Sequence, residues 1–469
     1  MPSPSRAHAT TAEKICNFVA QTATKNIPSS VRQTAKVHLL DGVAVMLAGA
    51  TESSSNLLRR HFFNPKAHGE ATVFGTRIRY SAQHAAFLNG FQGHVLDYDD
   101  SQLTTLASRP TGQQVHPTVP VLAAAVAVAE SRRLSMTALI DAYIVGVEVA
   151  CRLGDAVDPS HYLDGLHPTG TLGVFGAAMA CAHLLKLPRS SIGCALGIAG
   201  TLASGLRANR GTMAKGLNAG RAAENGVLAA TLAARGFTAS QNIFDDSMGF
   251  FRALCRGQFD ADLLRFGKPF FFAKPGIAVK LYPCAGVLHP ALDLVLSLRK
   301  RHAIAAKQID RIRVKLDVNA AAPLVYDAPA NALEAKFSLQ FAVAIAMLDG
   351  AAGLSQFTAA RLRDRNTQNL LKRIELVRLP VRRNRPEIGI DTRVEISVTG
   401  GAVYHSRGAI ARGHPSLGKP RAEVEEKFRQ SVAAILPERR AGDFLNKFWN
   451  LERAGSLRIW LRSLRTARR

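Results

Sequence analysis

A group of ionisable side chains ends the stretch AFLNGFQGHVLDYDD, which begins at residue 86, and a second histidine follows after a polar loop. His94 and Asp97 are three residues apart, so on a helix they would share one face. Pro117 favours an extended conformation for His116. Histidine exchanges protons near neutral pH, and a carboxylate can orient it or act as the base. The stretch therefore predicts a site for proton-transfer chemistry. The alternative is that DYDD caps a helix and that the histidines are surface residues.

A second stretch with chemical potential is His167-Pro168-Thr169-Gly170-Thr171, which precedes an expected helix. Thr169 or Thr171 could serve as its N-cap. The unpaired backbone N–H groups at the start of a helix can receive an anion such as a carboxylate. The glycines resemble a phosphate loop only weakly, because GK[ST] and a preceding strand are missing, and we expect them to permit close helix packing.

Basic residues precede another expected helix. Arg207, Arg210 and Lys215 lie in a glycine-punctuated loop, and the helix is expected to start near Gly220. Such a loop is suited to binding carboxylates, because charge-assisted hydrogen bonds are the stronger kind. The alternative is an ordinary basic loop on the surface.

A third informative stretch is KLYPCAGVLHPALD, which combines a cation with groups that exchange protons. Lys280, Tyr282 and His289 lie around a turn bounded by proline, and a helix is expected to begin at Pro290. These side chains are therefore further candidates for a site that handles an anion.

The elements expected to carry these residues are mostly helices. Apolar residues at helical spacing, or Ala- and Val-rich runs with small residues, predict helices packed on several sides. The alternation in 70–80 predicts a small hairpin or loop excursion. Helices are expected at 11–25, 29–50, 82–96, 119–133, 136–153 and 190–206.

The composition shifts near residue 265. Strands are expected at 308–318, 372–382 and 392–405, with a helix at 335–348, and helices return after 413. We therefore expect a mainly α protein, in which a large all-helical domain carries a smaller inserted α+β domain. The expected boundaries are 1–265 for the first helical part, 266–410 for the α+β domain and 411–469 for the return. Leu457, Leu461 and Leu464 share one face of the last helix, which is expected to dock on the protein itself.

Composition sets the class and the compartment. The chain has 469 residues, of which 47% are hydrophobic and 20% charged, as in ordinary soluble globular proteins. No apolar run is long enough to span a membrane, and the first 15 residues lack the apolar core of a signal peptide. The six cysteines form no C-x-x-C pair and show no zinc or iron–sulfur spacing. We expect an intracellular protein in the cytoplasm or another reducing compartment, without a metal.

The formal net charge of +25 has two interpretations. One is affinity for nucleic acid or a membrane surface. The other is attraction of small polyanionic substrates, with much of the excess in surface arginines. No nucleic-acid-binding motif is present, and the arginines are dense late in the chain, at 361–385 and 453–469. We favour the second interpretation and expect neither a nucleic-acid nor a membrane partner.

With these stretches in order, the chain resembles the MmgE/PrpD family, which includes 2-methylcitrate dehydratase and cis-aconitate decarboxylase. Any one segment is a weak signal, but nine in the same order cover essentially the whole chain. They include AAFLNGFQGHVLDYDD (85–100), VHPTVPVLAAAVAVAE (115–130), LHPTGTLGVFGAA (166–178), GTMAKGLNAGRAAENGVLAA (211–230) and KLYPCAGVLHPALD (280–293).

The resemblance implies a homodimeric lyase that acts on small di- or tricarboxylates without a cofactor, in a cleft between a helical and an α+β domain. The chain departs from the family at Asn218, where a histidine is common, and in the variable loop 101–114. The family's active-site positions fall on Asp97, His116, His167, Lys215, His289 and the loop threonine region, Ser101 or Thr104. We expect the substrate to be bound by Thr104, Arg207, Arg210, Lys280 and Tyr282.

The first expectation for the reaction is elimination of water, as in 2-methylcitrate dehydratase, which would place the chain in propionate metabolism. The alternatives are a carboxy-lyase like cis-aconitate decarboxylase, a related enzyme acting on another carboxylate, and a polyanion-binding protein that is not an enzyme. In each enzymatic case Lys215 would hold substrate carboxylates, and His116, His167 and His289 would form the acid/base set. Asp97 would orient a histidine or act as the base.

Overall fold

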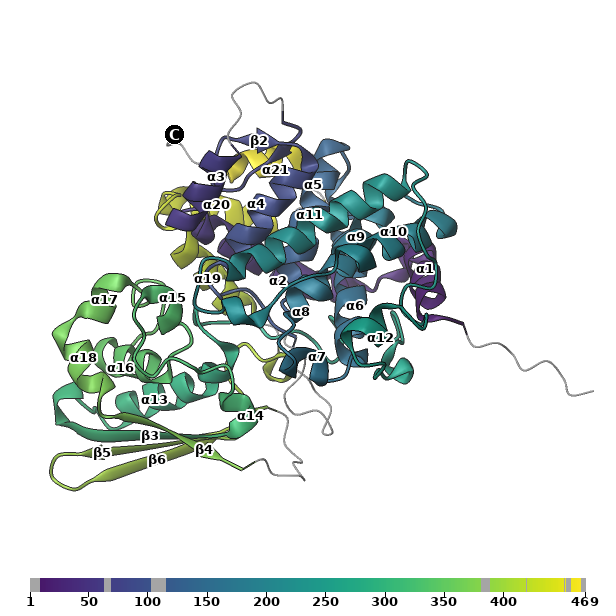
Figure 1. Cartoon of the computed structure of the whole chain (residues 1–469). Helices are drawn as coiled ribbons and strands as arrows, with labels where there is room; N and C mark the ends of the chain where they lie inside the picture. Colours follow the sequence, from purple (N-terminus) through teal and green to yellow (C-terminus); the bar gives the residue numbers. More distant parts are fainter. Residues whose placement is uncertain are drawn as a thin grey trace, which may run out of the picture.

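The computed structural model describes residues 9–62, 69–102, 115–380, 389–418, 420–450, 452 and 457–464. Figure 1 shows a large helical part and a smaller part with one sheet, which lies at the lower left in green. The expected mainly α class is confirmed. In the described part of the chain, no helix combines the length and the apolar character needed to cross a membrane.

The helical part is built from small-residue helices whose backbones approach closely. A Cβ on Gly90 would lie 2.9 Å from the carbonyl oxygen of Ala219, and one on Gly220 would lie 2.8 Å from that of Phe87. Contacts this short require glycine, so α4 and α11 cross here almost backbone to backbone. The helices of this part are α1 (Thr11–Gln21), α2 (Ser29–Gly49), α3 (Ser53–His61), α4 (Ala82–His94), α5 (Thr118–Ser131), α6 (Met136–Ala156), α7 (Ser160–Leu163), α8 (Pro168–Thr171), α9 (Gly173–Leu184), α10 (Arg189–Leu202), α11 (Lys215–Ala233) and α12 (Phe250–Leu254).

The smaller part packs helices on a four-stranded sheet of order β4-β3-β5-β6. β3 (Ile309–Asp317) pairs in parallel with β4 (Ile374–Leu379), whereas β5 (Thr392–Val398) is antiparallel to β3 and to β6 (Val403–Gly408). The helices are α13 (His289–Arg301), α14 (Val318–Ala321), α15 (Ala332–Ala335), α16 (Leu339–Asp349), α17 (Ala359–Arg363) and α18 (Arg365–Leu371). α13 and α16 contact the strands and bury the apolar side of the sheet against themselves.

The end of the chain returns to the helical part. α19 (Arg421–Val432) packs on α2, and α20 (Glu438–Phe448) and α21 (Leu457–Ser463) follow; all three are yellow in Figure 1. One hydrophobic core joins residues between 27 and 279 to residues between 424 and 464, and a second core contains residues 282 to 396. The buried Leu457, Leu461 and Leu464 confirm that the last helix docks on the protein itself.

Several local expectations need correction. The helix expected at 11–25 ends at Gln21, and the strand expected at 392–405 is the hairpin β5–β6, which turns at Gly400 and Gly401 with positive φ. The hairpin expected at 70–80 is confirmed as the short pair β1 (Ala71–Thr72) and β2 (Arg79–Tyr80), so the larger part is not purely helical.

Candidate active site

A pocket lies between the two parts, with about 700 Å³ of space free of protein atoms, including open solvent at its mouth. Residues before position 216 line one side, and residues from 280 to 390 line the other. The pocket therefore lies where two segments distant in sequence meet. Its lining includes seven of the residues expected from the sequence, which are Asp97, His116, His167, Arg207, Arg210, Lys215 and Lys280.

Asp97 is the carboxylate of the pocket, and it lies just after α4 in a left-handed turn with φ of 52°. The expectation that it shares a helix face with His94 is wrong, because α4 ends at His94. Aspartate tolerates this conformation better than most residues. Its Oδ1 accepts a hydrogen bond of 2.7 Å from Lys215 Nζ, and Lys280 Nζ lies 3.1 Å from Oδ2. Burial opposes ionisation, but the two lysines hold the pKa of Asp97 well below its ordinary value.

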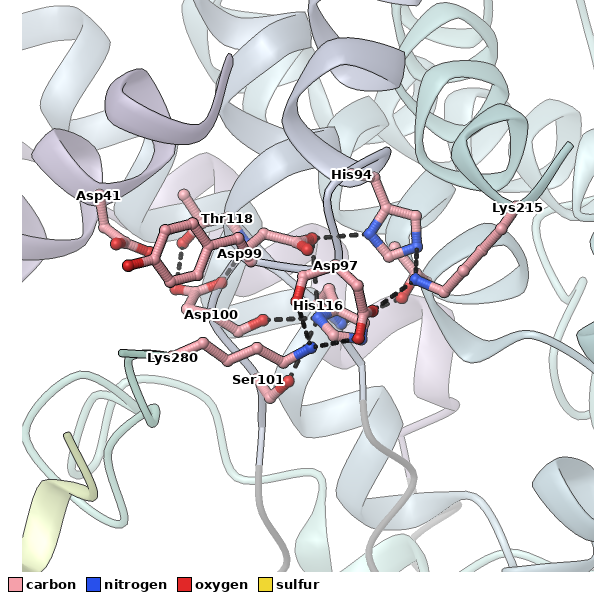
Figure 2. Close-up of polar contacts among 12 residues, drawn as sticks. Asp41, His94, Asp97, Asp99, Asp100, Ser101, His116, Thr118, Lys215 and Lys280 are labelled. Carbon is pink, nitrogen blue, oxygen red and sulfur yellow. Dashed lines mark hydrogen bonds and ion pairs between the residues drawn. The ribbon is translucent and has the colours of Figure 1, made fainter. Parts of the chain in front are cut away.

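His94 is fully buried, and its ring lies beside the end of the Lys215 side chain (Figure 2). The carboxylate of Asp99 can only accept, so His94 Nδ1 donates to it at 2.8 Å, and Nε2 accepts from Lys215 Nζ at 3.0 Å. Burial and the nearby Lys215 lower the pKa of His94 well below its ordinary value. This direction agrees with the hydrogen bonds, because Nε2 can accept from Lys215 only in the neutral ring. The chain Asp99–His94–Lys215 thus fixes the ammonium and leaves its third N–H for the pocket.

Lys215 is the first residue of α11, whereas the sequence suggested a helix start near Gly220. Glycine in that stretch does not mark a helix start. Gly216 and Gly220 lie within the helix. Both positions need glycine, because Phe91 and the backbone of Phe87 leave no room for a Cβ there. The same close crossing of α4 and α11 brings Lys215 to the end of α4, where His94 is located.

His116 presents a single nitrogen to the pocket. Its Nδ1 donates to the carbonyl oxygen of Asp100 at 2.8 Å and lies 3.2 Å from Ser101 Oγ, so Nε2 is the nitrogen left for a ligand. Its backbone N–H donates to Thr169 Oγ at 3.1 Å. Burial is the main reason that the pKa of His116 lies well below its ordinary value, although Asp99 opposes this shift. The lowered pKa favours the neutral form of His116, whose Nε2 can accept a hydrogen bond or a proton.

His167 faces the same pocket from the start of α8, with its ring edge-on to that of His94 at 5.4 Å. Burial, with His94 and Lys215, lowers its pKa well below the ordinary value. The proposed N-caps are wrong: Thr169 Oγ accepts from His116, and Thr171 Oγ lies 2.7 Å from His161 Nε2. The threonines instead brace the two histidine-bearing segments.

The two arginines complete a cationic pocket. Arg207 stacks 3.4 Å above the centre of the Tyr162 ring and donates to the Tyr162 carbonyl oxygen. Arg210 donates to Ala322 O at 3.4 Å, and its own carbonyl accepts from Tyr326 at 3.0 Å, which links it to the α+β part. The described lining residues include four cationic side chains and one carboxylate, so with neutral histidines the pocket carries three net positive charges.

Three predicted site residues are not placed in the lining. His289 is 3% exposed, edge-on to Tyr282, and burial lowers its pKa to about 3. The Tyr282 hydroxyl donates to Asp293 at 2.6 Å and accepts from Arg412 at 2.8 Å, and neither partner belongs to the pocket lining. Thr104 lies outside the described residues. Of the two candidates in the loop threonine region, Ser101 lines the pocket.

The sequence interpretation missed Tyr162 and Phe337, which also line the pocket. Tyr162 lies five residues before His167, but an isolated tyrosine carries no signal by itself. Phe337 comes from a segment far along the chain, and Lys215 Nζ lies 5.9 Å from its ring centre. The departure at Asn218 leaves an amide that donates to the backbone oxygen of Lys215 at 3.1 Å.

The described residues that could hold a metal ion by distance are His94, Asp99 and His116, whose ligand atoms lie within 4.8 Å of one another. Two observations favour the hydrogen-bonded arrangement instead. The His94–Asp99 contact of 2.8 Å has hydrogen-bond length, and the ammonium of Lys215, 3.0 Å from His94, would repel a further cation.

Comparison with known proteins finds relatives that match most of the chain. The chain is 28% identical to human cis-aconitate decarboxylase over 426 residues, which covers 88% of this chain and 85% of that protein. It is 28% identical to cis-aconitate decarboxylase of Aspergillus terreus, covering 74% of this chain and 73% of that protein. It is 26% identical to cis-aconitate decarboxylase-like protein oryM of Aspergillus oryzae, covering 94% of each.

Two family models account for most of the chain. The MmgE/PrpD N-terminal domain matches residues 13–262, and the MmgE/PrpD C-terminal domain matches residues 282–452. The gap between the matches, 263–281, contains the segment that brings Lys280 to the pocket. The chain therefore belongs to the MmgE/PrpD family.

Proposed function

We propose that this protein is a carboxy-lyase that acts on a small tricarboxylate of the cis-aconitate type. The observation that carries the substrate class is the charge of the pocket, since three net positive charges complement a tricarboxylate with three negative ones. The relatives named cis-aconitate decarboxylase support the same reaction. The proposal places this carboxy-lyase above the dehydratase expected from the sequence.

The reaction is balanced without an oxidant or reductant. The C–C bond between the CH2 group and its carboxylate breaks, and CO2 leaves. The electrons of that bond form a new C=C bond at the CH2 carbon, and the original double bond delivers its electrons to the CH carbon at its far end. That carbon takes one proton, which gives itaconate. Because this carbon lies next to a carboxylate, negative charge develops on carboxylate oxygens in the transition state.

Lys215 and Lys280 are the groups that meet this charge. Each has N–H groups committed to Asp97 or His94, and each lines the pocket. Their fixed ammonium groups need little reorganisation when the charge develops, and buried donors of this kind lower the barrier most. Arg207 and Arg210 would hold the carboxylates that do not react.

His116 or His167 would deliver the proton. In the unliganded pocket, burial and the nearby cations lower both histidine pKa values. A bound trianion neutralises the excess positive charge of the pocket and raises both pKa values, so a histidine can take a proton from solvent and give it to carbon. The neutral tautomer of His116, with Nε2 free, suits this exchange.

The dehydratase is the second candidate, because two histidines line one pocket. One could remove a proton next to a carboxylate while the other protonates the leaving hydroxyl. The same cationic pocket would stabilise the developing charge. For either reaction we propose that 266–410 is an inserted domain and that the cleft it forms with the helical part is the active site.

An NMR substrate screen separates the two reactions. Purified protein treated with EDTA would be incubated separately with cis-aconitate, 2-methylcitrate and citrate. Itaconate and CO2 from cis-aconitate alone would support the proposal. Loss of water from 2-methylcitrate would replace it with the dehydratase. No turnover of the three would reject both and favour another carboxylate or a binding role.

A further inference from the structure

Lys427 is a buried cation that contributes to none of the chemistry above. It lies in α19, which returns to the helical part after the sheet, and it is 2% exposed. Figure 1 shows α19 near the junction of the two parts. Isolated buried ammonium groups are costly, so their partners show what they do.

Three oxygen atoms surround the ammonium of Lys427. Nζ donates to the carbonyl oxygen of Tyr98 at 2.6 Å and to that of Lys280 at 2.8 Å, and it forms an ion pair of 2.5 Å with Asp41 Oδ1. The ammonium also lies 3.8 Å from the centre of the Tyr98 ring. Because it has three N–H groups and three oxygen partners, it has none left for a substrate.

The two carbonyl groups belong to the two segments that form the charged centre of the pocket. Tyr98 directly follows Asp97, and Lys280 is the second lysine on the Asp97 carboxylate, at 3.1 Å. Three further contacts join these segments. They are the antiparallel bridge between Ser101 and Ala278, a hydrogen bond of 3.3 Å from the Tyr98 hydroxyl to Leu281 O, and one of 3.1 Å from Lys280 Nζ to Asp97 O. Lys280 Nζ directs two of its three N–H groups to the carbonyl and carboxylate oxygens of Asp97, which leaves one for the pocket. A change in the separation of the two backbones would therefore alter the direction of that remaining N–H.

We propose that Lys427 is a positioning residue, which sets the Asp97–Lys280 geometry by holding the backbones of Tyr98 and Lys280 on one ammonium. The inference rests on the proposed function only in assigning Asp97 and Lys280 to the substrate pocket. The ammonium of Lys427 donates to both carbonyl oxygens at once. A methionine of similar length has no N–H group and cannot hold the two carbonyl groups together.

A purely structural role must be separated from this one. Asp41 is fully buried, and burial raises its pKa to about 6 even though Lys427 opposes the rise. Removing the lysine alone would leave that carboxylate without its cation and destabilise the fold. The informative comparison is therefore D41N against the double variant D41N/K427M, because the double variant leaves no unpaired charge behind.

We expect the double variant to melt within a few degrees of D41N and to show kcat/KM for cis-aconitate lower by about ten- to a hundredfold, with a raised KM. A merely structural role would lower the active fraction and leave KM unchanged. Equal kcat/KM and KM in the two variants would overturn the inference.

Crystal structures of D41N and D41N/K427M give a readout that does not depend on turnover. We expect the Tyr98 and Lys280 carbonyl oxygens to move apart in the double variant, and unchanged positions would overturn the inference. If the wild-type protein turned over none of the carboxylates, the proposed function would fail, and these two structures would still decide the role of Lys427.

Discussion

Replacing Lys215 with methionine tests the proposed chemistry most directly. Methionine keeps an unbranched side chain but removes the ammonium that lies 2.7 Å from Asp97 and 3.0 Å from His94. Lys280 remains 3.1 Å from Asp97, so the carboxylate keeps one cation. The variant therefore loses the N–H that faces the pocket without leaving a wholly unpaired buried charge.

The expected loss follows from the number of donors removed. One preorganised donor to a developing oxyanion is worth about 2.7–4 kcal/mol, which is about 10²–10³ in rate. We expect K215M to lower kcat/KM for cis-aconitate by about this factor. The folding penalty should stay below the roughly 3–5 kcal/mol of a fully broken buried pair, since Lys280 still neutralises Asp97. Itaconate formation would be followed by NMR and folding by circular dichroism.

K36M is the matched control. Lys36 is 1% exposed and donates to Trp449 O and to Glu452, both at 3.1 Å, so it is a buried lysine that is not in the pocket lining. We expect K36M to lose stability and to keep kcat/KM near the wild-type value. A folded K215M within threefold of wild type would refute the assignment of Lys215 to the reaction.

Three further predictions concern single residues. H116Q should lower kcat by about 10²–10⁴, because general acid–base catalysis contributes that much. Steady-state kinetics at saturating cis-aconitate measure kcat, and an unchanged kcat would exclude His116 as the proton donor. R207M should raise KM for cis-aconitate by about ten- to a hundredfold, since one charge-assisted contact is lost, and a titration that finds KM unchanged would show that Arg207 binds no substrate carboxylate. The pKa of His289 is lowered by burial to about 3, against about 6.5 when unfolded. Its neutral form is therefore favourable above pH 6.5, and stability falls as the pH drops from 6.5 towards 3. H289Q should lose less Tm than wild type over that interval in calorimetry, and parallel Tm curves would contradict this.

Much of the helical architecture follows from the sequence alone. The helices at 29–50 and 119–133 were predicted within one or two residues, because their apolar and small-residue pattern is a local property of the chain. Residue type also identified His116, His167 and Lys215 as chemically competent. Whether they catalyse the reaction remains a prediction, but their presence in one pocket agrees with it.

Local patterns misled where a residue had a tertiary role. Gly220 suggested a helix start because glycine is a common boundary signal. In the structure it lies inside α11, where a Cβ would clash with the backbone of α4. Thr169 suggested a cap because threonine is a common N-cap, yet its hydroxyl supports His116. In both cases the partner lies more than 50 residues away, and a local pattern carries no information about it.

Only the tertiary structure decided how the charges are paired. Asp97 meets lysines that are 118 and 183 residues later in the chain, and Lys427 reaches back to Tyr98. The sequence determined which groups could carry charge and which segments would be helical, because both are properties of single residues and short windows. The protonation of each group depends on burial and on neighbours within a few ångströms, and these exist only once distant segments have packed together.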